Sequence, residues 1–232
     1  MTELIQISQD LKEKGIEIIL SYIKIDNIKV KKTQEPPLFN YTQEVINQIR
    51  CKYTIDSVKY DEVIRAYRDF YWHFLKIDPT KQRPSSEALI RRILVNKNIP
   101  RISNFVDLNN WVSIDTKIPL GAYDFDKLEI PLILRFARKG EEFIPIGGKN
   151  KILKGNEIIM ADSSGLIIHL FPHRDSDITK ITENTKSALV IACGVPKMTS
   201  KLTENSLKKF TRILSQINEN IKCSEIKTIK SF

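Results

Sequence analysis

Short apolar segments rich in isoleucine dominate the second half of this chain and constrain its fold more than any other feature. They cover residues 128–138, 141–146, 157–162, 166–171 and 188–194. Turn-forming residues such as Gly147-Gly148 and Lys154-Gly155 separate them. Short segments enriched in β-branched residues and bounded by turn residues are typical of strands. This half of the chain is therefore predicted to form a mostly antiparallel sheet.

Helical periodicity surrounds the predicted sheet. Apolar side chains recur at helical spacing in residues 40–53, 61–77, 102–114 and 204–221. Residues 83–87 (RPSSE) predict a further helix start, in which a serine caps the first free amides and Glu87 complements the helix dipole. The residues expected to face inward from that helix are Ala88, Leu89, Ile93 and Leu94.

The first thirty residues contain two stretches, 3–8 and 16–30, whose composition favours extended structure. Strands at the start, helices next and a sheet after them indicate an α+β fold in one body. A separable N-terminal strand unit is the alternative.

The basic charge of the chain is concentrated in two segments. The 232 residues hold 37 Lys and Arg against 28 Asp and Glu, a formal net charge of +9. Residues 50–100 carry eleven basic and six acidic side chains, and residues 197–232 carry eight and three, whereas residues 101–196 carry twelve of each. Such a localised excess favours an anionic partner such as nucleic acid, with solvated helix faces as the equally weighted alternative.

Several broad classes of protein lose support. No run approaches the ~20 apolar residues of a membrane span, and the acidic start is unlike a signal peptide, so a soluble cytoplasmic protein is expected. P-loop, GxGxxG and GxSxG motifs are absent from the sequence. Neither the cysteines nor the histidines have metal-binding spacing, so no metal and no cofactor is predicted. The cysteines (Cys51, Cys193, Cys223) are expected to be structural thiols in a reducing compartment, and the histidines are His73, His169 and His173.

Three polar clusters interrupt apolar sequence. Asp107-Leu108-Asn109-Asn110 lies inside a predicted helix, where the amides either bind a ligand or, as we favour, satisfy nearby backbone. Arg135 and Arg138 precede two glutamates, and an ion pair is favoured over phosphate contact. Residues 171–185 combine an imidazole, a guanidinium, carboxylates and hydroxyls in a predicted loop. For that loop a functional site and a set of local turns are equally supported.

Six stretches of the chain, in order, resemble the B3/B4 domain found in the beta subunit of phenylalanyl-tRNA synthetase. They are residues 102–110 (ISNFVDLNN), 119–124 (PLGAYD), 125–128 (FDKL), 135–141 (RFARKGE), 161–162 (AD) and 182–185 (TENT). A longer stretch that includes residues 66–71, 78–81 and 83–89 is similar to free-standing B3/B4 proteins, which occur without a synthetase core.

The resemblance implies a three-layer α+β fold that contains a β-sandwich with flanking helices. Residues 1–232 are then a single B3/B4-like domain. Its core match is 83–196, residues 1–82 are an N-terminal strand and helix extension packed on it, and residues 197–232 are a C-terminal helix region.

The resemblance also implies a site between the layers, which in the synthetase hydrolyses tyrosine wrongly esterified to the phenylalanine tRNA. Asn110 matches the asparagine of an Asp-x-Thr-Asn motif that lines this editing pocket, and Asn109 stands at the threonine position. Gly121 replaces the histidine of a Pro-Leu-His-Ala-Phe-Asp motif. Residues 169–176 are bulky and charged where the synthetase has a glycine-rich segment. The fold is expected to carry over, whereas tyrosine editing is not assumed.

The resulting hypothesis is a trans-acting deacylase whose partner is tRNA or aminoacyl-tRNA. Asn109 and Asn110 orient the ester and the terminal adenosine, His173 or Asp175 orders the water as a catalytic residue, and Arg174 holds a phosphate or the oxyanion. The predicted substrate-binding set is Asn109, Asn110, Gly121, Arg174 and Thr182, and the predicted RNA-binding residues are Arg91, Arg92, Lys208 and Lys209. The alternatives are a non-catalytic tRNA- or RNA-binding module and a pocket for an amino acid.

Overall fold

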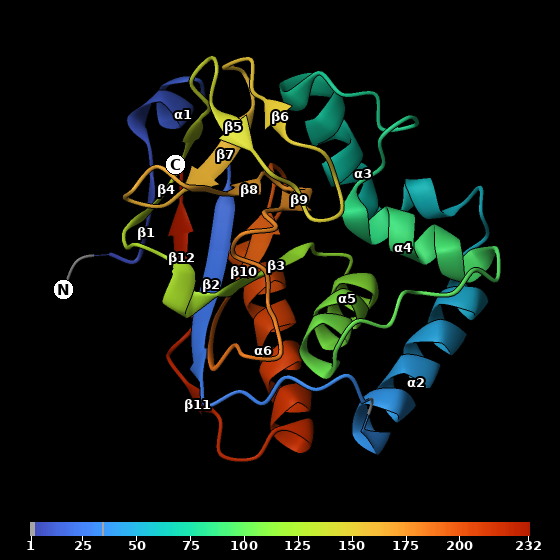
Figure 1. The fold of residues 1–232 in the computed structure, drawn as a ribbon. Helices are drawn as coiled ribbons and strands as arrows, with labels where there is room; N and C mark the ends of the chain where they lie inside the picture. The colour runs from blue at the N-terminus through green and yellow to red at the C-terminus, as the bar shows by residue number, and fades with distance from the viewer. Residues whose placement is uncertain (1–2, 34) are drawn as a thin grey trace.

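The fold was analysed in a computed structural model that describes residues 3–33 and 35–232 (Figure 1). The α-helices are α1 Gln9–Glu13, α2 Pro36–Lys52, α3 Glu62–Phe70, α4 Ser85–Leu94, α5 Asn104–Thr116 and α6 Ser200–Ile217, with a π-helical turn Tyr71–Leu75 after α3. The strands are β1 Ile5–Ile7, β2 Ile19–Asp26, β3 Leu120–Asp124, β4 Leu132–Phe136, β5 Glu142–Phe143, β6 Lys151–Ile152, β7 Ile158–Ala161, β8 Ile167–Leu170, β9 Arg174–Asp175, β10 Ser187–Gly194, β11 Lys222–Cys223 and β12 Lys227–Lys230.

Across residues 3–33 and 35–232, the strands form two five-stranded sheets and the small β5–β6 pair. The first sheet has the order β1-β4-β7-β8-β9, and the second has the order β11-β2-β10-β3 with β12 also paired to β2. Every pairing in these sheets is antiparallel except that of β1 with β4. The Ile-rich segments thus form strands as predicted, but they divide among three sheets: β4, β7 and β8 lie in the first, β10 pairs with β2 and β3 in the second, and β5 pairs with β6.

The two sheets and the helices form three layers. The first sheet packs on one face of the second, where the rings of Tyr123 on β3 and His169 on β8 meet edge to face with centroids 6.1 Å apart. Helix α6 covers the opposite face, where Thr203 hydrogen-bonds Ser21 of β2 at 2.7 Å. The architecture is therefore α+β with a β-sandwich, as expected from the sequence.

Helices α2, α3 and α4 form a separate apolar cluster against α5. Periodicity predicted these helices, but the first turn of α4 differs from the prediction. Its N-cap is Pro84, which makes no side-chain cap, and its buried residues are Ser86, Glu87, Ile90 and Ile93. The predicted serine cap was wrong. Of the predicted inward face, Ile93 is buried and Leu89 and Leu94 pack partly buried against the cluster, but the buried face also includes Ser86, Glu87 and Ile90, because Glu87 lies between two arginines.

The C-terminal strands β11 and β12 pair with β2, the second strand of the chain, in the second sheet. Strand β2 lies between β10 on one side and β11 and β12 on the other, so it is an interior strand rather than part of a separable unit. Helix α6 ends at Ile217, four residues before its predicted end, and the chain then returns as β11 and β12. In the described part of the chain, no helix combines the length and apolar character needed to cross a membrane.

Candidate active site

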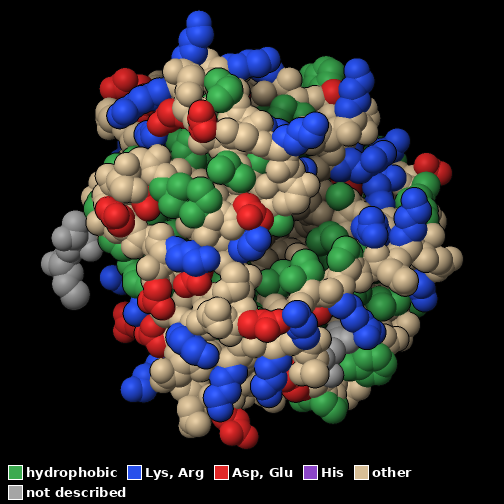
Figure 2. All heavy atoms as spheres, in the orientation of Figure 1, with side chains coloured by type: hydrophobic (Ala, Val, Ile, Leu, Met, Phe, Trp, Pro, Cys, Tyr) green, Lys and Arg blue, Asp and Glu red, His purple; other side chains and the backbone are tan. Residues whose placement is uncertain are grey.

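A cavity of about 260 Å³ lies between α5, strand β3 and the segment that joins β8 to β9. Figure 2 shows a hollow in this face, with hydrophobic side chains inside it and Lys and Arg side chains beside it. The polar lining residues are Ser85, Asn109, Asn110, Ser113, His169, His173, Arg174, Asp175, Lys180 and Cys193. The apolar lining includes Leu89, Val106, Leu120, Ile146 and Ile181.

Six of the seven residues predicted to bind or act on substrate line this cavity: Asn109, Asn110, Gly121, His173, Arg174 and Asp175. Thr182 does not line it, because it belongs to a turn in which its backbone N–H donates to Thr185 Oγ1 at 2.9 Å. Thr185 in turn donates to Asp124 Oδ2 at 2.7 Å. Thr182 is therefore placed to support the loop rather than to touch a ligand in the cavity.

Asn109 combines a structural and a binding capacity. Its side-chain amide donates to the carbonyl oxygen of Leu120 at 2.9 Å, which joins α5 to β3. Its Oδ1 is buried and has no hydrogen-bond partner in the described structure. A buried acceptor without a partner is uncommon and indicates a missing donor. Asn110, on the next position of α5, is half-buried at the same cavity.

Asp175 binds a histidine and a tyrosine through one carboxylate oxygen. Its Oδ1 accepts hydrogen bonds from Tyr123 Oη at 2.7 Å and from His169 Nδ1 at 2.8 Å. His169 is buried, and its ring lies edge to face against both Tyr123 and Phe171. Because a carboxylate only accepts hydrogen bonds, Nδ1 of His169 is the donor in this contact, and whenever the ring carries a single proton Nε2 is an acceptor.

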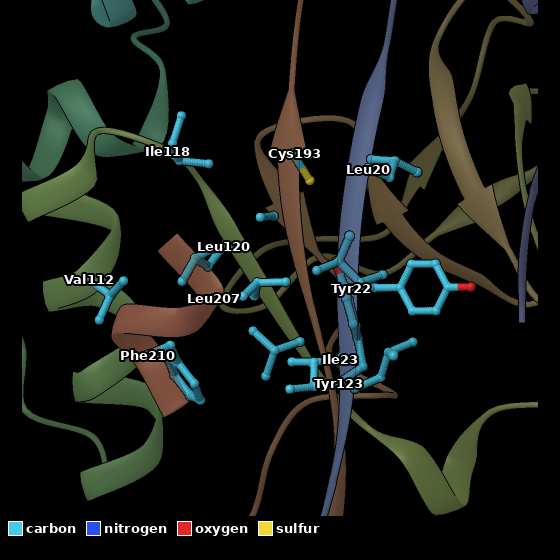
Figure 3. Packing of buried hydrophobic residues seen from close by; sticks show 14 of the residues in the cluster. Leu20, Tyr22, Ile23, Val112, Ile118, Leu120, Tyr123, Cys193, Leu207 and Phe210 are labelled. Carbon is cyan, nitrogen blue, oxygen red and sulfur yellow. The ribbon is translucent and has the colours of Figure 1, made fainter. Parts of the chain in front are cut away.

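The acceptor nitrogen of His169 lies 4.0 Å from Cys193 Sγ. Figure 3 shows the Cys193 side chain on the same side of the second sheet as Leu20 and Tyr22, away from Leu207 and Phe210 of α6. His169, Tyr123 and Cys193 were not among the predicted site residues. The only sequence signal for them was a histidine inside the apolar segment 166–171 and a cysteine inside the apolar segment 188–194.

Burial sets the protonation of two of these groups. It raises the pKa of the Cys193 thiol well above its usual range, and the charge of Asp175 adds to this effect. Burial, together with nearby His169 and Arg174, lowers the pKa of His173 to about 3. His173 is therefore neutral at physiological pH, and its Nδ1 has no partner in the part of the chain that the structure describes.

The Tyr123 hydroxyl leaves no room for a side chain at residue 121. A Cβ atom on Gly121 would overlap the hydroxyl of Tyr123, which points back along β3 toward it. The tyrosine hydroxyl thus fills the room that a side chain at residue 121 would need, and it uses that position to bind Asp175.

The B3/4 domain family matches residues 66–224, more than half of the chain. The chain belongs to this family. Curated relatives include phenylalanine–tRNA ligase beta subunits from Fusobacterium nucleatum, 38% identical over 111 residues, and Bifidobacterium longum, 31% identical over 135 residues. The matches cover 47% and 53% of this chain but only 14% and 16% of those relatives.

A solved structure supports the same fold. An N-terminal fragment of the phenylalanyl-tRNA synthetase beta subunit from Pyrococcus horikoshii superposes with a TM-score of 0.53 at 14% identity. The similarity covers 97% of this chain and 53% of the fragment. It extends beyond the family match, to nearly the whole B3/4 chain.

The predicted RNA-binding residues of this B3/4 chain fall into two groups. Arg91 donates to Glu87 at 2.8 Å and to the carbonyl oxygen of Ile55, and Lys209 forms an ion pair with Asp115 at 2.6 Å. Both cations are therefore committed to contacts within the protein. Arg92 and Lys208 are exposed, and Arg92 donates to the carbonyl oxygen of Asn98.

A second hollow of the B3/4 chain carries basic residues that the prediction did not name. It is a cleft of about 520 Å³ between α2 and the segment after α4, lined by Arg50, Lys97 and Arg101. Arg50 donates to Asn96 Oδ1 at 2.9 Å. In the described structure, none of these three cations has a carboxylate within 4.0 Å. We call this hollow the basic cleft.

Proposed function

We propose that the protein hydrolyses the ester bond of an aminoacyl-tRNA, acting as a deacylase. The observation that carries the proposal is the convergence of Asn109, Asn110, His173, Arg174 and Asp175 on one cavity. A concave site with an apolar wall and a few convergent polar groups is the usual form of a small-molecule or catalytic site. The B3/4 relatives are tRNA ligase subunits by name, which favours a charged tRNA as the substrate.

The cavity suits the aminoacyl end of such a substrate. At about 260 Å³ it is smaller than the roughly 300–1,000 Å³ of pockets for drug-sized ligands, so it fits one amino acid better than a whole nucleotide. Asn109 Oδ1 offers an acceptor to the α-amino group, and Asn110 offers an amide to the ester or the ribose. Arg174 is exposed at the cavity and can pair with a phosphate.

The basic cleft supports a polyanionic substrate. Arg101 lines the cleft and the next residue, Ile102, lines the cavity, so the two hollows adjoin. A strand that places its 3′ end in the cavity can therefore run its phosphates along Arg50, Lys97 and Arg101. We expect the protein to meet this substrate in the cytoplasm, where tRNA is charged.

The test is release of amino acid from a panel of correctly and wrongly charged tRNAs. At least one pair is expected to lose its amino acid faster than in buffer. Asn110→Ala removes a cavity amide and is expected to slow release by at least about 10-fold, an amount typical of one lost polar contact. Asn205→Ala, on the exposed face of α6, is the matched control and leaves the rate unchanged. Release no faster than in buffer for every pair contradicts the proposal.

A non-catalytic RNA-binding module is the second candidate, and the basic cleft is the observation that favours it. It predicts that uncharged tRNA binds as tightly as charged tRNA and that no amino acid is released. Equilibrium binding of the charged and uncharged forms of one tRNA separates the two candidate functions. A deacylase is expected to bind the charged form more tightly, because the aminoacyl group contacts the cavity.

A further inference from the structure

Cys193, His169 and Asp175, from three different strands, form a chain of polar contacts at the wall of the cavity. Cys193 of β10 faces His169 of β8 with Sγ 4.0 Å from Nε2, and His169 faces Asp175 of β9 with Nδ1 2.8 Å from Oδ1. All three residues line the cavity described above. A nucleophile, a base within reach of it and a third group that orients the base are the components of covalent acyl-transfer sites.

We propose that Cys193 is the nucleophile of this cavity, with His169 as its general base and Asp175 as the residue that positions the base. The inference rests on the proposed function for its substrate class, an aminoacyl ester. It goes beyond that function because it assigns a covalent intermediate, and because it gives roles to Cys193 and His169, which the sequence analysis did not place in the site, and a positioning role to Asp175, which it predicted to order the water.

The surroundings of His169 support the role of a base. Tyr123 and Phe171 hold the ring edge to face from two sides, at centroid distances of 6.1 Å each. Tyr123 also donates to the same carboxylate oxygen as His169, which fixes the rotamer of Asp175. The ring therefore has one available nitrogen, Nε2, and it faces the thiol.

The strand that carries Cys193 is held equally firmly. The Cys193 backbone N–H donates to the carbonyl oxygen of Pro119 at 3.1 Å, and its own carbonyl oxygen accepts a hydrogen bond from the buried Tyr67 hydroxyl. Because β10 pairs with β2 along its whole length, the backbone of Cys193 is held in place, and its side chain is buried between the sheets.

A second observation in the cavity points to a ligand independently of the cysteine. Asn109 is 6% exposed, lines the same cavity, and has a buried Oδ1 without a partner in the described residues. An α-amino group is a donor that this oxygen lacks, and it lies next to the ester carbonyl in every aminoacyl ester. Binding of that group at Asn109 would bring the carbonyl carbon into the cavity that Cys193 lines.

The reaction balances with water as the only co-reactant. Cys193 Sγ forms a bond to the ester carbonyl carbon while its proton passes to His169 Nε2. The bond from that carbon to the ribose oxygen then breaks, and the imidazolium returns the proton to the ribose oxygen, which leaves a thioester. Water, deprotonated by His169, attacks the thioester, and the thiol is restored as the amino acid departs.

A neutral thiol at rest agrees with this sequence of steps. Burial raises the pKa of Cys193, so the sulfur carries its proton at rest, and attack on a carbonyl carbon requires His169 to remove that proton. Proton transfer to His169 is then coupled to attack, as in sites where a hydroxyl is the nucleophile.

The test is trapping of the acyl-enzyme from a tRNA charged with radiolabelled amino acid. After an acid quench, label is expected on the wild-type protein, removable by neutral hydroxylamine and located on the Cys193 peptide by mass spectrometry. Cys193→Ala is expected to lose the label and to slow release at least about 100-fold. Cys51→Ala and Cys223→Ala, which change exposed cysteines, are the matched controls. Both are expected to keep the label and the wild-type rate of amino acid release.

His169→Gln gives a second readout that a structural role would not produce. With the base removed, acylation is expected to slow while substrate affinity, measured with a non-hydrolysable amide analogue, stays within about 2-fold. Thermal unfolding of each variant shows whether it is folded. If Cys193→Ala is folded and releases amino acid at the wild-type rate, the cysteine mechanism is overturned and the deacylase function stands.

A small activated ester tests the cysteine nucleophile separately when the proposed deacylase function fails. If no charged tRNA is hydrolysed, the proposed function falls, and p-nitrophenyl acetate then tests the cysteine alone. A stoichiometric burst that acetylates Cys193 and requires His169 supports the nucleophile. Absence of a burst, or acetylation confined to Cys51 or Cys223, overturns it.

Discussion

At the scale of single residues, Gly121 and Tyr123 form a coupled pair. The tyrosine hydroxyl lies where a Cβ of residue 121 would be and donates to Asp175, which holds His169. Compared with the family motif that the sequence resembles, one substitution removes a side chain and the other supplies a hydroxyl two positions later. In this chain the polar group at this point of the cavity is therefore the Tyr123 hydroxyl.

Substitution of Gly121 tests this coupling. Gly121→Ala is expected to destabilise the protein by about 1–3 kcal/mol, because the added methyl group must displace the buried Tyr123. In a Tyr123→Leu background the same change is expected to cost less than about 0.5 kcal/mol, because the ring and hydroxyl are absent. Chemical denaturation of the two single variants and the double variant measures the coupling free energy. Additive effects would contradict a shared space.

His173 makes stability depend on pH. Its pKa is lowered from 6.5 to about 3 in the folded protein, so below pH 6.5 the unfolded chain binds a proton that the folded chain does not. Its contribution to stability is therefore complete above about pH 6.5 and is lost as the pH falls toward about 3. Between pH 6.5 and about 5 the loss is expected to reach at most about 2 kcal/mol.

The pH effect is measured by urea unfolding of wild type and His173→Gln at pH 7.5 and pH 5. The variant is expected to lose less stability on acidification than the wild type. His73→Gln, which changes an exposed histidine, is the control and keeps the wild-type difference. An equal loss in wild type and His173→Gln would show that carboxylates alone account for the acid sensitivity.

The sequence could identify several residues of the cavity but not the interacting trio within it. Asn109, Asn110 and the segment with His173 were visible because polar residues interrupt apolar sequence there. His169 and Cys193 are 24 residues apart and each sits alone in an apolar strand, where a buried structural role is the usual one. Only the packing of β8 on β10 brings them together, and that packing is a property of the sandwich.

At the scale of elements, a buried carboxylate joins α3 to α4. Glu87 is fully buried, and it binds Arg68 of α3 at 3.0 Å and Arg91 of α4 at 2.8 Å. Periodicity predicted both helices, but it could not predict this contact, because a glutamate in the first turn of a helix usually faces solvent near the dipole. Short strands without an apolar run, such as β9 and β11, were missed for a related reason: pairing rather than composition makes them strands.

Removal of this carboxylate tests how strongly it joins the helices. Glu87→Ala leaves two mostly buried guanidinium groups without a counter-charge and is expected to destabilise the protein by about 3–5 kcal/mol. Glu87→Gln keeps the volume and some hydrogen bonds and is expected to cost less. Glu44→Gln removes an exposed carboxylate on α2 and serves as the control, with a free energy of unfolding expected to stay within about 0.5 kcal/mol of the wild-type value. If Glu87→Ala also stayed within that range, the buried ion pairs would not hold α4 in place.

At the scale of the whole molecule, the net charge of +9 is less informative than its distribution. In the C-terminal helix, Lys209 is paired with Asp115, which weakens the expectation that α6 grips RNA. In the preceding helical region, Arg50, Lys97 and Arg101 line one cleft that adjoins the cavity across residues 101 and 102. The two hollows share α5, which contributes Trp111 to the cleft and Asn110 to the cavity.

This arrangement predicts that tRNA affinity depends on salt through the cleft. Each phosphate contact removed lowers the slope of log affinity against log salt concentration by about 0.7–0.9. A variant with Arg50→Gln, Lys97→Gln and Arg101→Gln is therefore expected to show a slope about 2 units shallower, measured by filter binding at several salt concentrations. The matched variant with Lys12→Gln, Lys139→Gln and Lys149→Gln removes the same charge from exposed positions on α1, the β4–β5 loop and the β5–β6 loop. The two variants have equal net charge. A shallower slope in the cleft variant alone therefore shows that the phosphates contact the cleft, whereas equal slopes show that the tRNA is attracted by the net charge of the protein. Lys208→Gln in the same assay measures what α6 adds.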